Sequence, residues 1–247
     1  MVRHELGSTG IAVSVLGLGT VKIGRESGLK HPARFALPSD TEVMNLLLTA
    51  RELGINVLDT APAYGSSEER IGALRPGRRE EWVLMTKAGE QYAEATGSRF
   101  DFSPEAIIAS VDHSLVSLRT DYVDVVSIHS DGRDDALLDA GCLQVLDMLK
   151  AEGKVRATGF SSKTVSGGLR AAELADVVMV MVNMRDDAQL EVARKAHGTG
   201  RGVLVKKPLD SGWDDPAESL RYVLSFAEVS SAIVGTIDPA HLQDNAA

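Results

Sequence analysis

Short apolar runs alternate with amphipathic stretches along the chain, and this alternation limits the fold more than any other feature. Each of eight apolar runs is followed by apolar positions at helical spacing. Strands that alternate with helices pair in parallel, because each helix returns the chain to the same edge of the sheet. Eight such units within 247 residues predict an α/β protein, a closed (β/α)8 TIM barrel. The predicted strands are residues 15–20, 55–59, 82–87, 123–129, 154–161, 177–183, 202–207 and 231–235.

The remaining segments complete this prediction. Residues 2–6 and 11–13 flank a glycine turn and predict an N-terminal β-hairpin. Segments 22–38 and 89–102 are polar or rich in Gly and Pro, so we expect irregular loops at the rim. No linker or change of composition divides residues 1–247, which predicts one domain with a short last helix. The predicted helices are residues 40–53, 68–74, 104–118, 137–152, 165–172, 188–197, 216–226 and 239–245.

Composition excludes several classes of partner. The net charge is -9 and no run of Lys or Arg is present, so we expect no nucleic-acid partner. The only cysteine, Cys142, lies in an apolar stretch and is expected to pack rather than react. No apolar run approaches the roughly 20 residues of a membrane span, and no signal peptide opens the chain, so we expect a cytoplasmic protein without a membrane partner. No sequence feature predicts an oligomeric state.

Polar residues or glycines stand where the predicted strands end. Because the active sites of such barrels lie at the carboxyl ends of the strands, these residues form the predicted site. Gly19 and Gly235 would let a ligand approach the backbone closely. The other strand-end residues are Asp59, Lys87, His129, Ser161, Asn183 and Lys206.

Four of the residues at this rim suit proton transfer. Tyr64 follows Asp59 in a loop broken by Pro62 and Gly65. A tyrosine can act as a general acid near neutral pH if its pKa falls, and the Lys87 ammonium would lower it. His129 could donate a hydrogen bond to a substrate oxygen. The simpler interpretation is an ion pair beside an unrelated tyrosine and histidine, and a third possibility is Lys87 as a Schiff-base amine. No histidine, aspartate or glutamate spacing indicates a metal site.

At this point the sequence resembles the aldo-keto reductase superfamily over nearly its whole length. Residues 6–14 and 16–20 resemble the N-terminal hairpin and first strand of that family. Residues 59–65, Asp-Thr-Ala-Pro-Ala-Tyr-Gly, followed by Ser67 and Glu68, resemble its most specific motif. The resemblance implies that Tyr is the proton donor, that Lys and Asp tune it, and that His orients the carbonyl. The residues in these roles would be Asp59, Tyr64, Lys87 and His129.

The resemblance also implies a nicotinamide cofactor, NADP with NAD as an open alternative. Ser161, Ser162 and Asn183 would hold the carboxamide, although the family usually has Asn and Gln where Ser162 and Asn183 stand. Lys206 replaces the aromatic residue that stacks on the nicotinamide in many members. In the segment near the adenosine phosphate, Gly235 and His241 stand where NADP-preferring members usually have Lys or Arg, and acidic Asp238 lies between them. Asp238 could instead simply cap the last helix. The other implied cofactor residues are Gly19, Thr20, Pro208, Leu209, Ser211, Thr236 and Asn245.

Two functions of different classes remain open from the sequence. The leading hypothesis is an NAD(P)H-dependent reductase of a small-molecule aldehyde or ketone, with Tyr64 as the proton donor. The alternative is a dinucleotide-binding redox sensor or regulatory subunit with little turnover. The physiological substrate is not readable from the sequence.

Overall fold

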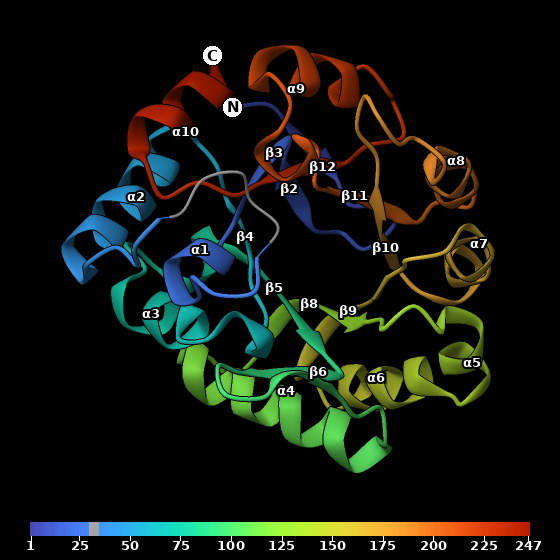
Figure 1. The fold of residues 1–247 in the computed structure, drawn as a ribbon. Coiled ribbons are helices and arrows are strands. Elements are labelled where there is room, and N and C mark those ends of the chain that lie inside the picture. Colours follow the sequence, from blue (N-terminus) through green and yellow to red (C-terminus); the bar gives the residue numbers. More distant parts are fainter. Residues whose placement is uncertain (30–34) are drawn as a thin grey trace.

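The computed structural model describes residues 1–29 and 35–247 and confirms the predicted TIM barrel. Eight parallel strands close in the order β10-β11-β12-β3-β4-β5-β8-β9, with the helices around the outside (Figure 1). The first strand of the barrel pairs with the last one, because Leu16 of β3 lies in register with Ala232 of β12. The barrel strands are β3 Leu16–Gly19, β4 Val57–Asp59, β5 Val83–Ala88, β8 Val123–His129, β9 Val155–Ser161, β10 Val177–Met181, β11 Gly202–Lys206 and β12 Ser231–Val234.

Several helices begin at a residue whose side chain accepts a hydrogen bond from a free backbone N–H group of the first turn. Ser39 forms a capping box with Glu42, and the Ser103 side chain accepts from the Ala106 N–H at the start of a helix whose first residue is Pro104. The helices are α1 Val21–Gly24, α2 Asp40–Glu52, α3 Ser67–Leu74, α4 Pro104–Leu118, α5 Asp134–Asp139, α6 Cys142–Ala151, α7 Val165–Leu174, α8 Leu190–Gly198, α9 Pro216–Leu224 and α10 Pro239–Ala246. Three 3-10 helices are η1 Pro62–Tyr64, η2 Arg79–Glu81 and η3 Asp210–Gly212.

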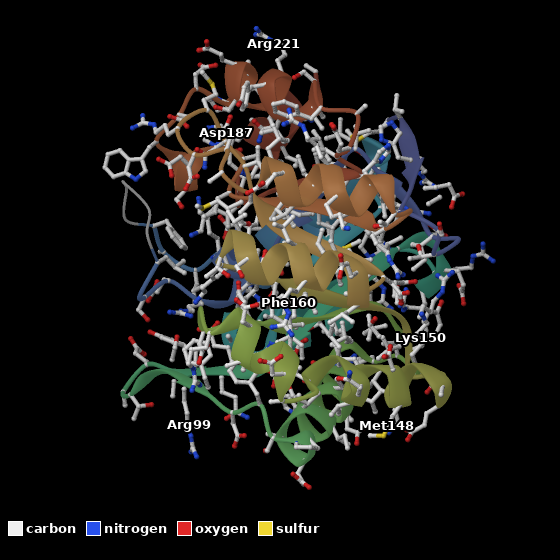
Figure 2. All side chains as sticks on the ribbon, turned by 90° about the vertical axis from the view of Figure 1, so that its right-hand side faces the viewer. Arg99, Met148, Lys150, Phe160, Asp187 and Arg221 are labelled. Atoms are coloured by element: carbon white, nitrogen blue, oxygen red, sulfur yellow. The ribbon has the colours of Figure 1, made fainter. Side chains whose placement is uncertain are left out.

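The apolar core has two layers. One lies between the strands and the helices, where Leu146 of α6 and Phe160 of β9 are fully buried. On α6, Leu146 is buried while Met148 lies at the edge of the molecule, as an amphipathic helix requires (Figure 2). The second layer fills the barrel with side chains such as Met85 and Leu204. Leu6, Ile11 and Val13 from the N-terminal hairpin, β1 Arg3–Glu5 with β2 Ala12–Ser14, join this inner layer.

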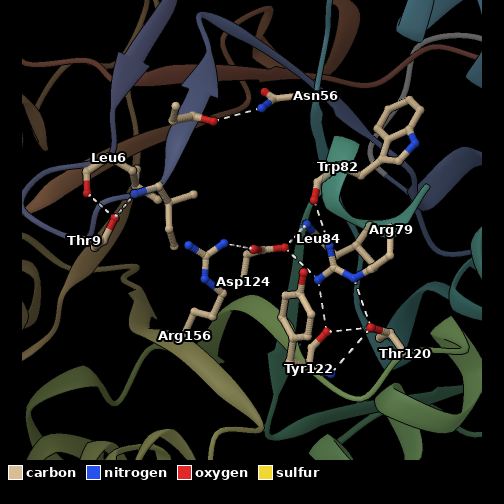
Figure 3. A network of polar contacts seen from close by, with 12 residues as sticks. Leu6, Thr9, Asn56, Arg79, Trp82, Leu84, Thr120, Tyr122, Asp124 and Arg156 are labelled. Atoms are coloured by element: carbon tan, nitrogen blue, oxygen red, sulfur yellow. Dashed lines mark hydrogen bonds and ion pairs between the residues drawn. The ribbon is translucent and has the colours of Figure 1, made fainter. Parts of the chain in front are cut away.

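A buried carboxylate ties together the amino ends of three barrel elements (Figure 3). Asp124 of β8 accepts hydrogen bonds from Arg79 Nη2 at 2.7 Å and from Arg156 Nη1 at 2.6 Å. It also accepts the Leu84 N–H of β5 at 2.8 Å. A groove of about 930 Å³ beside this network lies at the end of the barrel opposite the strand carboxyl ends. Two of the arginines that line the groove, Arg51 and Arg156, are already paired with carboxylates.

The structure corrects four of the predicted boundaries. Residues 89–102 are not irregular but form an antiparallel hairpin, β6 Glu90–Ala93 with β7 Gly97–Phe100. The predicted helix 137–152 is two helices, α5 and α6, separated at Gly141, whose φ of 81° no straight helix accepts. The strand predicted to reach Asn183 ends at Met181, because Asn183 enters a turn. The segment 22–38 begins inside α1, and His31 lies outside the described residues.

Two further findings concern the exterior and the cysteine. Within the described ranges, no helix combines the length and the apolar character needed to cross a membrane. Cys142 begins α6 with 2% of its surface exposed, and burial raises the pKa of its thiol to about 11. A thiol in this state is a packing group rather than a nucleophile, as its apolar surroundings in the sequence predicted.

Candidate active site

Asp59 and Lys87 form a buried ion pair at the carboxyl ends of β4 and β5. Lys87 Nζ donates to Asp59 Oδ1 at 2.7 Å and to the Thr60 carbonyl at 2.9 Å. Both side chains are less than a tenth exposed. Burial by itself would lower the pKa of Lys87, but the Asp59 carboxylate and Tyr64 outweigh burial and hold this pKa above its usual range. Lys87 is therefore a fixed ammonium at the rim.

A set of hydroxyl groups holds the strand end that carries Asp59. The Thr20 N–H and Oγ1 both donate to the Asp59 carbonyl at 2.9 Å. Ser67 Oγ bridges Thr20 and Thr60, at 2.7 and 3.0 Å. In the same region Thr86 Oγ1 donates to buried Glu68 at 2.5 Å, and this bond links α3 to β5. Ser67 and Glu68 thus stabilise the strand ends that carry the ion pair, through their hydrogen bonds to Thr20, Thr60 and Thr86.

Tyr64 lies at the end of η1, directly beyond β4. Gly65 follows it with a φ of 60°, and a Cβ on Gly65 would come within 2.1 Å of the Gly24 carbonyl. Only glycine fits this close approach, so the Tyr64 backbone is well defined. Lys87 Nζ lies 4.8 Å from the centroid of the Tyr64 ring. This is the juxtaposition that the strand-end pattern predicted.

The pKa of Tyr64 moves in the direction opposite to the one expected from Lys87 alone. Burial raises the pKa of Tyr64 and Asp59 adds to this effect, while Lys87 opposes it. The expected net lowering was therefore wrong, because it considered the neighbouring charge without the loss of solvent. The consequence is that Tyr64 is a protonated phenol at neutral pH, which is the form that a proton donor requires.

His129 completes the group at the end of β8. Its ring lies 6.2 Å from the Tyr64 ring, centroid to centroid, and nearly perpendicular to it. Its Nδ1 lies 2.9 Å from Glu90 Oε2. Burial lowers the pKa of His129, and Lys87 and Lys206 lower it further, against the opposing effect of Glu90. His129 is therefore mainly neutral near pH 7.

Lys206 is the last residue of β11, at the position where many members of the family that the sequence resembles have an aromatic residue. Its Nζ donates to Ser161 Oγ at 2.9 Å and to the Ser162 carbonyl at 2.7 Å. Burial lowers the pKa of Lys206 to about 7, and the charges of Lys207 and Lys87 act in the same direction. Lys206 is therefore an amine that titrates near neutral pH, beside the serines that the sequence analysis assigned to the cofactor.

Ser162 is a clear candidate for contact with a polar ligand. It is fully buried, and its Oγ lacks a hydrogen-bond partner among the residues with assigned positions. An unsatisfied buried hydroxyl is costly, and a bound amide would satisfy it. Asn183 is engaged differently, because its Oδ1 accepts the N–H groups of Arg185 and Asp186 and its Nδ2 donates to the Lys207 carbonyl.

The segment after β11 has an unusual backbone. Lys207, Asp210 and Ser211 have φ values of 54°, 42° and 62°. Three residues with side chains in the left-handed region within five positions are costly and typical of functional loops. Pro208 is buried there, and Leu209 is the residue immediately before η3. Arg185 reaches this segment from the loop after β10 and pairs with Asp214 at 2.5 Å.

The other cofactor candidates lie around β12 and α10. Gly19 ends β3, and exposed Gly235 directly follows the neighbouring strand β12. Among the described residues, a Cβ on Gly235 would meet only the Gly19 carbonyl, at 3.7 Å. This open position gives a ligand access to the backbone. Thr236 Oγ1 accepts the Asp238 N–H, and Asp238 caps α10 through the Ala240 N–H. His241 is exposed and Asn245 is half-buried on α10.

Sequence reasoning missed two carboxylates near the site. Glu90 contacts His129 but stood in a segment predicted to be irregular. Asp134 is buried and holds the loop after β9, because its Oδ2 accepts the Lys163 and Thr164 N–H groups at 2.8 and 2.7 Å. No sequence pattern singled out Asp134, because the helix predicted there began only at Leu137, whereas α5 begins at Asp134. Across residues 1–29 and 35–247, no group of three or more His, Cys, Asp or Glu side chains could hold a metal.

Comparison with known proteins agrees with this geometry. A solved structure of an aldo-keto reductase from Pseudomonas aeruginosa is 45% identical, covers 99% of this chain and 92% of its own, and superimposes with a TM-score of 0.91. NADH-specific methylglyoxal reductase of Escherichia coli is 33% identical over 86% of this chain and 68% of its own length. D-threo-aldose 1-dehydrogenase of a Pseudomonas species is 28% identical over 97% of this chain and 90% of its own length.

The sequence profile of the Aldo/keto reductase family matches residues 15–219, which include the described strand ends from Gly19 to Lys206. Members of this family use nicotinamide cofactors, and the named relatives are oxidoreductases. The profile match, the barrel and the rim residues agree, and the chain belongs to the aldo/keto reductase family.

Proposed function

We propose that this chain reduces an aldehyde or ketone group of a small molecule with NAD(P)H, and that Tyr64 donates the proton. The observation that carries the proposal is the convergence of a phenol, an ammonium and an imidazole at one rim. Lys87 Nζ lies 4.8 Å from the Tyr64 ring centroid, and the His129 and Tyr64 rings are 6.2 Å apart. Residues 1–247 would act as one domain in this reaction.

Each group has a role that follows from its surroundings. The nicotinamide, when bound, supplies a hydride to the carbonyl carbon. Tyr64 protonates the carbonyl oxygen, and burial keeps the phenol protonated until then. The Lys87 ammonium, held by Asp59, stabilises the phenolate that Tyr64 becomes. His129, whose ring lies 6.2 Å from the Tyr64 ring, would contact the substrate oxygen and donate a hydrogen bond to it when the facing ring nitrogen carries a proton.

The cofactor site is proposed from residues with free or adaptable hydrogen-bonding groups. Buried Ser162 Oγ lacks a partner within the described part of the chain and suits the nicotinamide carboxamide, with Ser161 beside it. Asn183 has little capacity left for this role, since its oxygen already accepts two backbone N–H groups. Thr20 also has a structural role, because it holds the Asp59 carbonyl. Leu209 and Ser211 would face the pyrophosphate from the strained segment after β11, and Gly19 and Gly235 leave room beside it.

The choice between NADP and NAD depends on charge near the adenosine ribose. Residues 235–247 contain no Lys or Arg, and the Asp238 carboxyl group caps α10 there. A carboxylate disfavours a nearby phosphate and can accept a hydrogen bond from a ribose hydroxyl. This pattern favours NADH over NADPH, and fluorescence titration with each dinucleotide measures the difference.

The first test is the substitution Tyr64→Phe, which removes the phenolic proton and keeps the ring. We expect turnover of an aromatic aldehyde to fall by a factor of about 100 or more, the range for loss of a general acid. Cofactor affinity should remain near that of the wild type, since Tyr64 acts on the substrate. Steady-state kinetics and cofactor titration measure the two quantities separately.

Tyr222→Phe is the matched control, because Tyr222 lies on α9 and its hydroxyl contacts only exposed Asp187 among the described residues. This variant should turn over aldehyde at the wild-type rate. Near-normal turnover in Tyr64→Phe would contradict the assigned proton donor. Tight dinucleotide binding by the wild type without oxidation of NADH or NADPH would instead support the redox-sensor alternative.

A further inference from the structure

The hairpin after β5 brings a carboxylate to the candidate catalytic histidine. Glu90 is the first residue of β6, and its Oε2 lies 2.9 Å from His129 Nδ1. The other carboxylate oxygen, Oε1, accepts the Ser98 Oγ hydrogen bond at 2.6 Å from β7. The side chains of Glu90 and His129 are 12% and 18% exposed, so the contact is shielded from most solvent.

The hairpin itself is well anchored, which keeps Glu90 in place. Four residue pairs connect β6 and β7, from Glu90 opposite Phe100 to Ala93 opposite Gly97. Tyr92 lies under the Arg25 guanidinium, 3.3 Å from ring centroid to Cζ, and its hydroxyl is 2.7 Å from Ser27 Oγ. The anchor therefore joins the hairpin to the segment that follows β3.

The charge state of Glu90 determines where His129 carries its proton. Partial burial would raise the pKa of Glu90, but His129 and Ser98 lower it to about 2, so the group is a carboxylate at neutral pH. The ionised Glu90 has no proton to donate. An unprotonated Nδ1 would face the carboxylate oxygen at 2.9 Å with its lone pair, and the two would repel each other. The proton of a neutral His129 therefore belongs on Nδ1, although Oε2 lies off the line of a good hydrogen bond.

The other ring nitrogen then has a defined character. Glu90 lies against Nδ1, so Nε2 is the ring nitrogen that remains for the substrate. With the proton on Nδ1, a neutral imidazole can only accept at Nε2. It becomes a donor at Nε2 when the ring takes up a second proton.

We propose that Glu90 is a positioning residue that holds the His129 proton on Nδ1 and presents a bare Nε2 to the substrate. This inference rests on the proposed carbonyl reduction and deepens it. A neutral His129 accepts a hydrogen bond from a substrate hydroxyl, whereas only the protonated ring donates one to a carbonyl oxygen. Carbonyl reduction should therefore become faster as the pH falls and His129 gains its second proton.

The charged groups around His129 come from four elements and act in opposite directions. Glu90 on β6 favours the protonated ring, while Lys87 on β5 and Lys206 on β11 disfavour it. Tyr64 on η1 is uncharged at neutral pH because burial raises its pKa. Lys163 also acts on the pair, since its charge helps keep Glu90 ionised. Loss of the Glu90 charge should consequently lower the pKa of His129.

The direct test is the tautomer of His129, measured by ¹⁵N NMR of the cofactor-free protein. The His129 signals are identified by their loss in His129→Asn. We expect Nδ1–H in the wild type at pH 8, and a shift of the population toward Nε2–H in Glu90→Gln. Glu94→Gln makes the same change at an exposed position in the hairpin turn and should leave the His129 signals unchanged.

Kinetics provide a second readout that a purely structural role would not alter. For an aromatic aldehyde, we expect the wild-type kcat/KM to rise about tenfold as the pH falls through the His129 titration, as an acid in that role requires. In Glu90→Gln the rise should weaken or move to lower pH, because a neutral ring can now carry its proton on Nε2. Ser98→Ala removes one hydrogen bond to Glu90 but keeps its charge, so it should leave the neutral His129 as Nδ1–H and should not move its titration to lower pH.

The outcomes separate this inference from the proposed function. Nε2–H in the wild type, or a Glu90→Gln variant with wild-type tautomer and pH profile, would overturn the role of Glu90. If Glu90→Gln fails to fold, the tautomer in the wild-type spectrum still decides the question. A wild type with the expected tautomer that reduces no carbonyl compound would contradict the proposed function but not the placement of the proton.

Discussion

At the scale of the residue, Lys206 shows how burial changes the pKa of a side chain whose hydrogen bonds within the described ranges go to serines. Its two hydrogen bonds go to the Ser161 hydroxyl and the Ser162 carbonyl, and neither neutralises its charge. The pKa of Lys206 is consequently lowered to about 7 by burial, against 10.5 for an ordinary lysine. Between these two values the unfolded chain binds one more proton than the folded protein. The free energy of unfolding of the wild type therefore rises with pH across this window. Below pH 7 the folded protein bears the whole cost of burying the charged Lys206 amine.

Lys206→Met tests this assignment because methionine has similar length and no charge. We expect the stability of the variant, relative to the wild type, to be greatest below pH 7 and to decline as the pH rises from 7 toward 10.5. Urea unfolding at several pH values measures this difference. Lys195→Met, at an exposed position on α8, should show no such trend. A pH-independent difference for Lys206→Met would show that the amine titrates normally.

At the scale of the element, the β6–β7 hairpin depends on the glycine before it. Gly89 has a φ of 105°, and a Cβ there would come within 2.2 Å of the Phe102 ring. Gly97, at the far end of the hairpin, has a φ of 74°, and a Cβ there would have no neighbouring atom within 4 Å. Both glycines therefore have a positive φ that favours glycine, but only at Gly89 would a side chain collide with a neighbouring residue.

Gly89→Ala and Gly97→Ala form a matched pair. Both should lose about 1 kcal/mol of unfolding free energy for the left-handed backbone. Gly89→Ala should lose more, because the methyl group displaces Phe102 or the hairpin, and it should also lower carbonyl reduction by moving Glu90 from His129. Urea unfolding and aldehyde turnover measure the two effects. Equal aldehyde turnover in the folded forms of both variants would show that the position of the hairpin does not matter for the reaction.

At the scale of the whole molecule, the barrel separates stability from chemistry. The Asp124 network joins β5, β8, β9 and η2 at the amino ends, while the candidate site lies at the carboxyl ends. Asp124 is 1% exposed and neutralises two arginines. Removal of one partner from a buried ion pair leaves an uncompensated charge, which is strongly destabilising.

Asp124→Asn should therefore lower the unfolding free energy by about 3 kcal/mol. The folded fraction should keep its aldehyde turnover, because the substitution is at the opposite end of the barrel. Thermal or urea unfolding, with turnover measured below the transition, checks both statements. Asp121→Asn, an exposed carboxylate in the preceding loop, is the control and should change neither. A stable but inactive Asp124→Asn would contradict this separation.

Much of the fold was predictable because its signals are local. Apolar periodicity and caps such as Ser39 and Ser103 identify the helices and strands from neighbouring residues alone. The hairpin 89–102 was missed because its residues are largely polar and exposed, so no apolar alternation marks the strands. The division of helix 137–152 was missed because the signal is one glycine conformation at Gly141.

The sequence by itself determined the barrel and the four side chains at its rim, since strand ends in a parallel barrel must meet at one face. Only the tertiary structure decided their electrostatic state. The pKa of Tyr64 rises rather than falls because burial, which depends on the whole fold, outweighs its charged neighbour. The contact of Glu90 with His129 likewise joins residues from separate elements, and no local pattern in either segment encodes it.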